Sequence, residues 1–532
     1  MSSDQLAHPS PLQLLLCAVL LFAPAPAGPA AAGSLGESAA GAQQPAGVQP
    51  APAPEQATLQ LPWLADGGAW ARLALRLLRE ADTHGLAPGR YGVEQLDRRL
   101  ADSADPAAGA AFERDLSVAM LRYLRDLRFG RTPSAYRAPD DTAERFDAAA
   151  YLAAALHAGR LAQAVQEAAP DLPLYRQVQA SLVHYRALAR LYPEWPPLPA
   201  VGAALAAGSR YAGAALLRER LRLLGDLDEA DTPGAADDRY TPALAAALAR
   251  FQARHGLAAH GLLDRPSLAA LAVPLPHRVA QLELTLERLR WLPPLAPGPV
   301  VAVNLPTYRL WAFDSSAGDV AAPLEMRIIV GAVKTPTPLF IGQIRHLELN
   351  PYWNVPRSIV IGEILPKLAR NPSYLRRNRM ELVAAGGQVL GADGGAGAAL
   401  RAGSVRLRQR PGEGNALGEL KFAMPNPDNI YLHSTPSREL FGRPRRDLSH
   451  GCIRVERPLE LAQFVLADRA KWDTAALQAA IATGRTRTLP LPAPVPVILF
   501  YATALADGAG RVQFSDDIYG KDAPLLRALQ EQ

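Results

Sequence analysis

A cysteine and a histidine that could perform nucleophilic chemistry lie close together in the C-terminal third of the chain. The segment IYLHSTPSRELFGRPRRDLSHGCIRVE places His433 at the end of an apolar run and, fifteen residues later, the tetrad Ser449-His450-Gly451-Cys452. A thiol is mostly protonated at neutral pH and needs a base to become a nucleophile. An imidazole is such a base. The pattern therefore predicts acyl transfer with Cys452 as the nucleophile and His433 as the general acid/base.

The other members of the tetrad would support the nucleophile. Gly451 lets the backbone approach a substrate closely, and Ser449 and His450 place hydrogen-bond donors beside the thiol. We expect all three to contribute to an oxyanion site formed with backbone N–H groups. The alternative is that Cys452 is only a small buried hydrophobic residue, as free cysteines often are.

The composition limits the classes of protein that could carry this site. The chain has 532 residues, of which 49% are hydrophobic, and a formal net charge of +5. Such a chain is not mainly disordered, and its small charge argues against a nucleic-acid partner. Two cysteines, Cys17 and Cys452, exclude a disulfide framework and a Cys-rich metal site. No histidine has ligand spacing with carboxylates, so we expect neither a metal nor a cofactor.

The first residues have the pattern of an export signal. An apolar run at 12–22 is followed by small residues and by Ala25-Pro26-Ala27, which predicts a signal peptide over residues 1–27. The run is shorter than the roughly 20 apolar residues that span a bilayer. No Lys or Arg precedes it, so an uncleaved membrane anchor is the alternative. Residues 28–58 are rich in Pro, Ala and Gly and predict a flexible tether.

Helical periodicity dominates the next part of the chain. Residues 59–200 predict a helical scaffold domain interrupted at HGLAPGRYG, FGRTPSAY and YPEWPPLP. Residues 201–275 predict a smaller helical domain in which Thr241 caps a helix that begins at Pro242. A linker helix is expected within 276–298.

Beyond Pro299 the pattern changes to short runs rich in β-branched residues. VVAVNLPTYRLWAF, LEMRIIVG, LFIGQIRHLELN, NIYLH and PVPVILFYA are separated by turn residues and predict strands. We expect a β-rich catalytic domain over 299–502, with an insertion at about 360–410, and then a C-terminal segment at 503–532. The fold class is thus multidomain α+β: helical domains first and a β-rich domain after them.

The spacing from His433 to the Ser-His-Gly-Cys tetrad resembles the L,D-transpeptidase catalytic domain of the YkuD type. NPYWNVPRSI, RPGEGNALGELKFAMPN, YLHSTP and DIYGKD are similar to segments of its large periplasmic YcbB-like subfamily. FQARHGLAAHGLLDRPSLAAL, within 201–275, resembles a three-helix peptidoglycan-binding module. The chain departs from the family at Arg454, where smaller members carry Asn, and at Ser434, where an Asp is expected.

The resemblance implies a peptidoglycan L,D-transpeptidase of cell wall biogenesis and cell shape. Cys452 would attack the third residue of a tetrapeptide stem, release D-alanine and form a thioester, and the amine of a second stem would complete a 3→3 crosslink. Donor and acceptor stems are the expected partners, with membrane-associated cell-wall synthesis enzymes as further partners. A periplasmic monomer that carbapenems inactivate is expected, with no cofactor.

A basic insertion is the second feature of this region. Residues 366–410 hold nine Lys or Arg against Glu381 and Asp393, a formal charge of +7. In the resembling subfamily an insertion here forms a lid, and a basic lid could steer the carboxylates of stem peptides. The alternative is a solvated charged surface. The substrate-binding residues that we predict are Arg454, Tyr431, Trp353, Arg376 and Arg377, although Tyr431 and Trp353 could equally be core aromatics.

Two other functions fit the same sequence. The site could hydrolyse stems as an L,D-carboxypeptidase, because the sequence barely separates hydrolase from transferase. A non-catalytic peptidoglycan-binding scaffold would use the module at 201–275 and tolerate loss of Cys452. A papain-like protease fits less well, since its cysteine precedes its histidine by more than a hundred residues.

Overall fold

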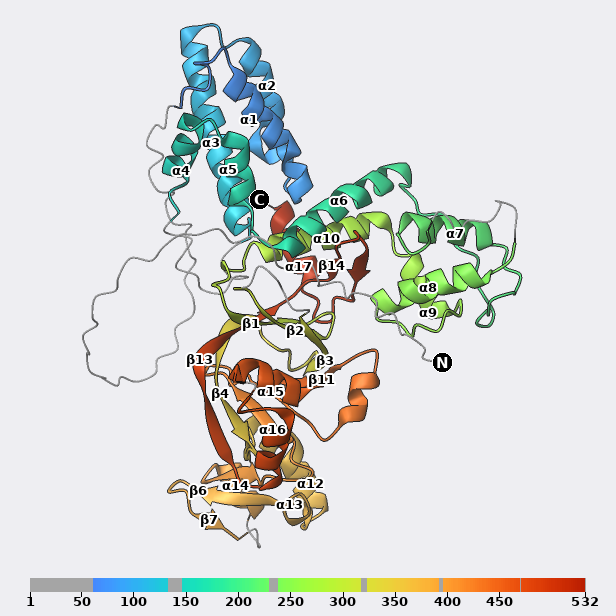
Figure 1. Ribbon diagram of the computed structural model, residues 1–532, viewed down its shortest axis with the longest axis vertical. Helices are drawn as coiled ribbons and strands as arrows, with labels where there is room; N and C mark the ends of the chain where they lie inside the picture. The colour runs from blue at the N-terminus through green and yellow to red at the C-terminus, as the bar shows by residue number, and fades with distance from the viewer. Residues whose placement is uncertain are drawn as a thin grey trace, which may run out of the picture.

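The computed structural model describes residues 61–132, 146–228, 238–316, 323–391, 396–468 and 470–531. The predicted signal peptide and tether lie outside these residues. The α+β organisation is confirmed, with helical domains followed by a β-rich domain (Figure 1). Within the described ranges no helix combines the length and the apolar character that crossing a membrane requires.

The first five α-helices form a bundle around one hydrophobic core. Trp63, Phe112 and Leu152 are fully buried in this core. Asp105 and Asp147 start the third and fourth helices by accepting hydrogen bonds from backbone N–H groups of the first turn. The helices are α1 (Ala69–Arg79), α2 (Val93–Ala101), α3 (Pro106–Phe129), α4 (Ala148–His157) and α5 (Leu161–Ala168), with 3₁₀ turns η1 (Glu80–His84) and η2 (Pro88–Tyr91) between α1 and α2.

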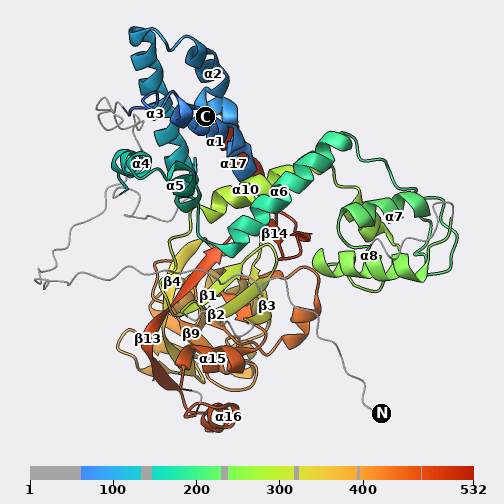
Figure 2. The ribbon, with the colours of Figure 1, turned by 45° about the horizontal axis from the view of Figure 1, so that its top comes forward.

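Two helices join this bundle to the rest of the molecule. α6 (Pro173–Leu191) and α10 (Leu275–Leu289) run side by side in Figure 1 and in Figure 2, and their contact is extensive. α10 lies in the region where we predicted a linker helix, and its Leu282, Leu286 and Leu289 are buried. They share a core with α6, with strands β1 (Pro299–Asn304) and β2 (Arg309–Asp314) and with the hairpin of β14 (Ala504–Ala506) and β15 (Val512–Phe514). α10 is therefore a packed central brace.

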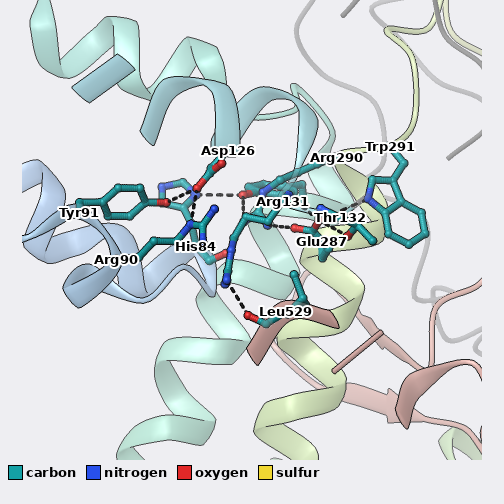
Figure 3. A network of polar contacts seen from close by, with 11 residues as sticks. His84, Arg90, Tyr91, Asp126, Arg131, Thr132, Glu287, Arg290, Trp291 and Leu529 are labelled. Atoms are coloured by element: carbon teal, nitrogen blue, oxygen red, sulfur yellow. Dashed lines mark hydrogen bonds and ion pairs between the residues drawn. The ribbon is translucent and has the colours of Figure 1, made fainter. Parts of the chain in front are cut away.

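A buried polar network attaches the bundle to α10 (Figure 3). Glu287 of α10 is 2% exposed, and its Oε1 accepts hydrogen bonds from the N–H groups of Arg131 (2.6 Å) and Thr132 (2.8 Å). Its Oε2 lies 3.1 Å from Nη1 of Arg290, which also donates to the Tyr175 hydroxyl (2.9 Å). A Cβ at Gly130 would lie 2.6 Å from Oε1, so only glycine admits the carboxylate here.

The network explains two interruptions in the helical pattern. Arg290 also donates to the carbonyl of His84, in the HGLAPGRYG segment. Arg90 and Tyr91, from the same segment, both donate to Asp126 of α3. The FGRT segment supplies the N–H groups that bind Glu287. These breaks between helices are thus docking segments as well as turns.

The smaller helical domain has its own core and a firm attachment. It contains α7 (Ala214–Leu223), α8 (Pro242–Arg254) and α9 (Arg265–Leu271). The predicted N-cap is confirmed, because Thr241 Oγ1 accepts a hydrogen bond from the Leu244 N–H (3.3 Å). Arg254 forms a buried ion pair with Asp226 (2.5 Å) and also donates to the Val512 carbonyl of the β14–β15 hairpin. That contact fixes the domain beside α6 and α10.

The β-rich domain is a closed sheet. Its nine strands follow the order β11-β3-β12-β10-β9-β4-β13-β1-β2, and a further pairing of β2 with β3 closes the ring. Helices α15 (Pro458–Leu466) and α16 (Thr474–Ala482) add apolar residues to the core that the sheet encloses. The strands are β1 (Pro299–Asn304), β2 (Arg309–Asp314), β3 (Leu324–Gly331), β4 (Phe340–Leu349), β9 (Leu420–Ala423), β10 (Leu432–His433), β11 (Asp447–Ser449), β12 (Ile453–Val455) and β13 (Arg487–Phe500).

The predicted insertion is a subdomain with a sheet and a core of its own. Its four strands have the order β5-β8-β6-β7, and because β5 begins at Trp353 the subdomain starts before residue 360. In Figure 1 it lies at the end of the barrel away from α1–α3. Its elements are β5 (Trp353–Asn354), α11 (Arg357–Ile359), the π-helical turn η6 (Val360–Ile364), α12 (Leu365–Arg370), α13 (Tyr374–Arg377), β6 (Met380–Ala384), β7 (Val389–Leu390), α14 (Ala396–Ala402) and β8 (Val405–Gln409).

The last helix, α17 (Asp522–Gln530), returns to the centre of the molecule. Asp522 pairs with the buried Arg288 of α10 (2.5 Å). Its neighbour Lys521 supplies a carbonyl to the same guanidinium (3.0 Å). The Leu529 carbonyl accepts from Arg131 (2.6 Å), so the C-terminal segment joins both the bundle and the brace.

Candidate active site

The two predicted catalytic residues come from neighbouring parallel strands. β10 pairs with β12 so that Leu432 lies opposite Ile453 and His433 opposite Arg454. Leu432 and Ile453 are fully buried in the barrel core. Because side chains alternate along a strand, His433 projects from the other face of this ladder. Cys452 lies in the bend directly before β12 and packs against the edge of the barrel core. The pairing thus places two segments nineteen positions apart in the sequence on neighbouring strands.

A hydrogen-bonded turn presents the cysteine. Ser449 Oγ donates to the Cys452 carbonyl (2.5 Å) and accepts from the Gly451 N–H (3.2 Å). Gly451 has φ +113, a conformation that side chains with a Cβ rarely adopt. Thr337, which lies outside the tetrad, also stabilises the turn, because its Oγ1 donates to the Gly451 carbonyl (2.7 Å). Ser449 and Gly451 therefore shape the turn, and the Gly451 N–H is already engaged by Ser449.

His433 is held as a neutral imidazole. It is buried, and its Nδ1 lies 2.6 Å from the Ser434 carbonyl, which can only accept a hydrogen bond. The proton is therefore assigned to Nδ1, and Nε2 carries the lone pair. Burial first, and then the positive charge of Arg454, lower the pKa of His433 to about 3. An unprotonated imidazole is the form that a general base requires.

The thiol of Cys452 is in its neutral form. It is half-buried, and Sγ lies 3.7 Å from the Asn429 carbonyl. Burial raises the pKa of the thiol above its usual value, although hydrogen bonding with Tyr431 and the charge of Lys421 act in the opposite direction. Within the described residues no hydrogen bond joins the thiol to His433. Proton transfer therefore requires Sγ to leave the Asn429 carbonyl and turn toward Nε2.

Two charged residues that the sequence analysis did not single out extend this face of the sheet. Lys421 of β9 lies opposite His433 and also opposite Glu348 of β4, with which it forms an ion pair (2.8 Å). Its Nζ lies 4.9 Å from the centroid of the Tyr431 ring. The alternation of charged and apolar residues in GELKF is the signal that could have indicated Lys421.

Ser434 has a clear role in place of the expected Asp. Its Oγ accepts hydrogen bonds from the N–H groups of Glu419 (2.7 Å) and Leu420 (3.0 Å) and donates to the Leu417 carbonyl (3.0 Å). A carboxylate could accept the first two hydrogen bonds but could not donate the third. A Cβ at Gly418 would lie 2.3 Å from this Oγ. Ser434 thus fixes the loop next to His433.

The predicted substrate-binding residues fall into two groups. Tyr431 lies beside the thiol, with its ring centroid 5.7 Å from that of His433, and Arg454 is half-buried on the same face with its Nε unpaired. Trp353 instead packs against the core of the insertion. Arg376 and Arg377 are exposed on α13, and the structure records no contact from them to the cysteine or histidine. Their role as substrate ligands stays a prediction.

His450 contacts the insertion. Its Nε2 is paired with Oε1 of Glu363, which belongs to the π-helical turn η6. Burial acts to raise the pKa of Glu363, but the hydrogen bond from His450 and the charge of Lys367 outweigh it and lower the pKa. The expected contribution of His450 to an oxyanion site stays a prediction.

The described residues contain no group of three or more His, Cys, Asp or Glu side chains that could hold a metal ion. A thiol and a neutral imidazole carried by neighbouring strands are the groups that cysteine-dependent acyl transfer uses.

Comparison with known protein families shows which families the regions of this chain match. Residues 298–497 match the L,D-transpeptidase catalytic domain (YkuD), residues 55–182 match the Scaffold domain, and residues 211–271 match the model described as "Putative peptidoglycan binding domain". The chain thus carries a YkuD-type L,D-transpeptidase catalytic domain preceded by scaffold and peptidoglycan-binding domains. This confirms the resemblance inferred from the Cys452 motif.

Individual relatives agree with the domain assignment. A Haemophilus influenzae protein named "Putative L,D-transpeptidase" is 33% identical over 277 residues, which are 50% of this chain and 54% of that protein. The chain therefore spans about half the length of the curated relative that it matches.

Two solved structures are also similar. An L,D-transpeptidase of Xylanimonas cellulosilytica is 16% identical, with 57% of this chain and 99% of that chain covered and a TM-score of 0.18. One of Stackebrandtia nassauensis is 13% identical, with coverages of 57% and 96% and a TM-score of 0.23. At these TM-scores the similarity adds no argument about the fold.

Proposed function

We propose that this protein is a peptidoglycan L,D-transpeptidase that forms 3→3 crosslinks between stem peptides. Cys452 is the nucleophile and His433 the general acid/base. The observation that supports this proposal most strongly is that β10, which carries His433, pairs with β12, which Cys452 directly precedes on a turn held by Ser449. The match of this region to the L,D-transpeptidase catalytic domain supports the substrate class.

The first half-reaction forms a thioester. Nε2 of His433 accepts the thiol proton, and the thiolate attacks the carbonyl carbon at the L-centre of the third stem residue. The Cys452 N–H, which is not engaged by any described group, can donate to the resulting oxyanion. Collapse of this intermediate breaks the bond to the terminal D-alanine, whose nitrogen takes the proton from His433. The products are free D-alanine and the acyl-enzyme.

The second half-reaction transfers the acyl group. The uncharged side-chain amine of a second stem attacks the thioester carbonyl, and His433 accepts a proton from that nitrogen. The C–S bond breaks, and the proton returns to the sulfur of Cys452. One amide replaces another over the cycle, so the reaction needs no cofactor or external energy source. A water molecule in place of the amine would instead release a tripeptide.

The remaining domains would bring this site to its polymer. We place the enzyme in the periplasm, exported by the signal peptide over residues 1–27. The domain at 211–271 would hold peptidoglycan, and membrane-associated cell-wall synthesis enzymes are proposed as partners of the monomer. Carbapenems would acylate Cys452, because they offer a reactive carbonyl to the same thiolate.

The test is incubation of the purified protein with a disaccharide-tetrapeptide, followed by mass spectrometry. A dimer that lacks one D-alanine, absent with Cys452→Ala, supports the transferase. A tripeptide alone would identify a carboxypeptidase, and an unchanged substrate would leave only a binding scaffold. The Cys452→Ala variant is the matched control because it keeps the turn and removes only the sulfur.

A further inference from the structure

One contact joins the insertion to the catalytic tetrad. Glu363 and His450 are 87 positions apart, and their side chains form an ion pair two residues from the cysteine nucleophile. The partner elements are the π-helical turn η6 of the insertion and the end of β11 of the barrel. π-helical turns inside helices occur often at functional sites.

The Glu363 carboxylate is shared between two basic side chains. Oε1 is paired with His450, and Oε2 lies 3.5 Å from Nζ of Lys367, one helical turn further along. The side chains of Glu363 and His450 are 40% and 47% exposed. An ion pair this accessible is weak and can exchange with a competing ion. The contact therefore has the properties of a reversible latch.

The charge distribution of the insertion singles out this carboxylate. Its other described acidic residue, Glu381, is 6% exposed and already bound by Arg408 and Arg410. Exposed arginines such as Arg376 add positive charge to the surface of the insertion. Glu363 is thus the described carboxylate of the insertion that reaches the tetrad, held there by groups that would bind any carboxylate.

We propose that Glu363 is an internal substitute for a substrate carboxylate. In the free protein it binds the side chains of His450 and Lys367 and holds the insertion against the tetrad. A carboxylate of the incoming stem peptide displaces it and takes the same two partners. The identity of that ligand rests on the proposed function, whereas the latch itself does not.

Charge-selective alkylation tests the latch without any turnover. Cys452 is alkylated with the anion iodoacetate and with neutral iodoacetamide. The rate with iodoacetate is divided by the rate with iodoacetamide, and this ratio is compared between variants. Glu363→Gln should raise the ratio several-fold, because an anion no longer competes with the Glu363 carboxylate. The control is Glu413→Gln, which removes one exposed negative charge from a loop outside the insertion. An unchanged ratio, or the same rise in the control, would overturn the latch.

Steady-state kinetics test the substrate assignment. Glu363→Gln should lower KM for the tetrapeptide donor about threefold or more, whereas Lys367→Met should raise it by a similar factor. A carboxylate that only braces the fold would move KM in the same direction in both variants, and that result would refute displacement. If no variant turns over stems, the proposed function fails while the alkylation ratio still decides on the latch.

Discussion

The ion pair between Glu287 and Arg290 should control how firmly the scaffold bundle is attached to the catalytic half. The informative change is Glu287→Gln, which is nearly isosteric. Its amide oxygen can still accept from the N–H groups of Arg131 and Thr132. Its NH₂ group would face the guanidinium of Arg290, so the variant removes the charge compensation and little else.

The magnitude follows from burial. Both side chains are about 2% exposed, so the guanidinium cannot turn to water when its partner is neutralised. Removing one member of a buried pair costs about 3–5 kcal/mol. The amide oxygen of the glutamine still accepts the two N–H groups, and the Tyr175 hydroxyl still contacts Arg290 (2.9 Å). We therefore expect a cost at the lower end of this range, about 3 kcal/mol. At about 1.4 kcal/mol for each factor of ten, this is roughly a hundredfold change in a local opening equilibrium.

Amide hydrogen exchange is the suitable assay, because a chain of several domains has no single unfolding temperature. The N–H groups of Arg131 and Thr132 bind Glu287 directly and report opening of the junction. Their protection should fall roughly a hundredfold in Glu287→Gln. Protection of the barrel strand β9 should not change, since its buried residues belong to the core of the barrel.

A matched control lies one turn earlier on the same helix. Glu283 pairs with Arg186 (2.6 Å), but its side chain is 27% exposed, so Glu283→Gln should cost at most about 1 kcal/mol. Gly130→Ala should weaken the junction as Glu287→Gln does, because its Cβ would meet the carboxylate. Unchanged protection at Arg131 and Thr132 in Glu287→Gln, or equal losses in Glu287→Gln and Glu283→Gln, would refute the reasoning.

Three further predictions concern the catalytic domain. Burial raises the pKa of the Cys452 thiol, and the pKa of His433 is lowered to about 3. Alkylation by iodoacetamide should therefore accelerate about tenfold per pH unit from pH 6 to 8, and a plateau there would indicate a preformed thiolate–imidazolium pair. Ser449→Ala removes both hydrogen bonds that Ser449 makes in the turn and should lower kcat about 10- to 100-fold. Acyl-enzyme formation, followed by mass spectrometry, should slow by the same factor. Wild-type kinetics in this variant would contradict the role of Ser449. Replacing Arg376 and Arg377 with Glu should raise KM for stem peptides about threefold or more at low salt, and unchanged turnover there would argue against steering by the insertion.

Local patterns predicted much of the site. The tetrad and the spacing to His433 indicated a candidate nucleophile and a candidate base, because these residues are close in sequence and their chemistry is specific. The capped start of α8 was also predicted, since the Thr241 cap acts within one turn. Lys421 and Glu348 were missed because their roles depend on the register of β9 between β4 and β10.

The sequence by itself determined the order of the domains, the alternation of the strands and the residue types that can carry acyl transfer. These properties depend on periodicity and spacing over a few residues, which the chain specifies locally. Only the tertiary structure decided that the FGRT segment docks on Glu287 and that Glu363 meets His450. Such contacts join charged residues far apart in the chain, and nothing in the local pattern distinguishes a future partner from a solvated charge.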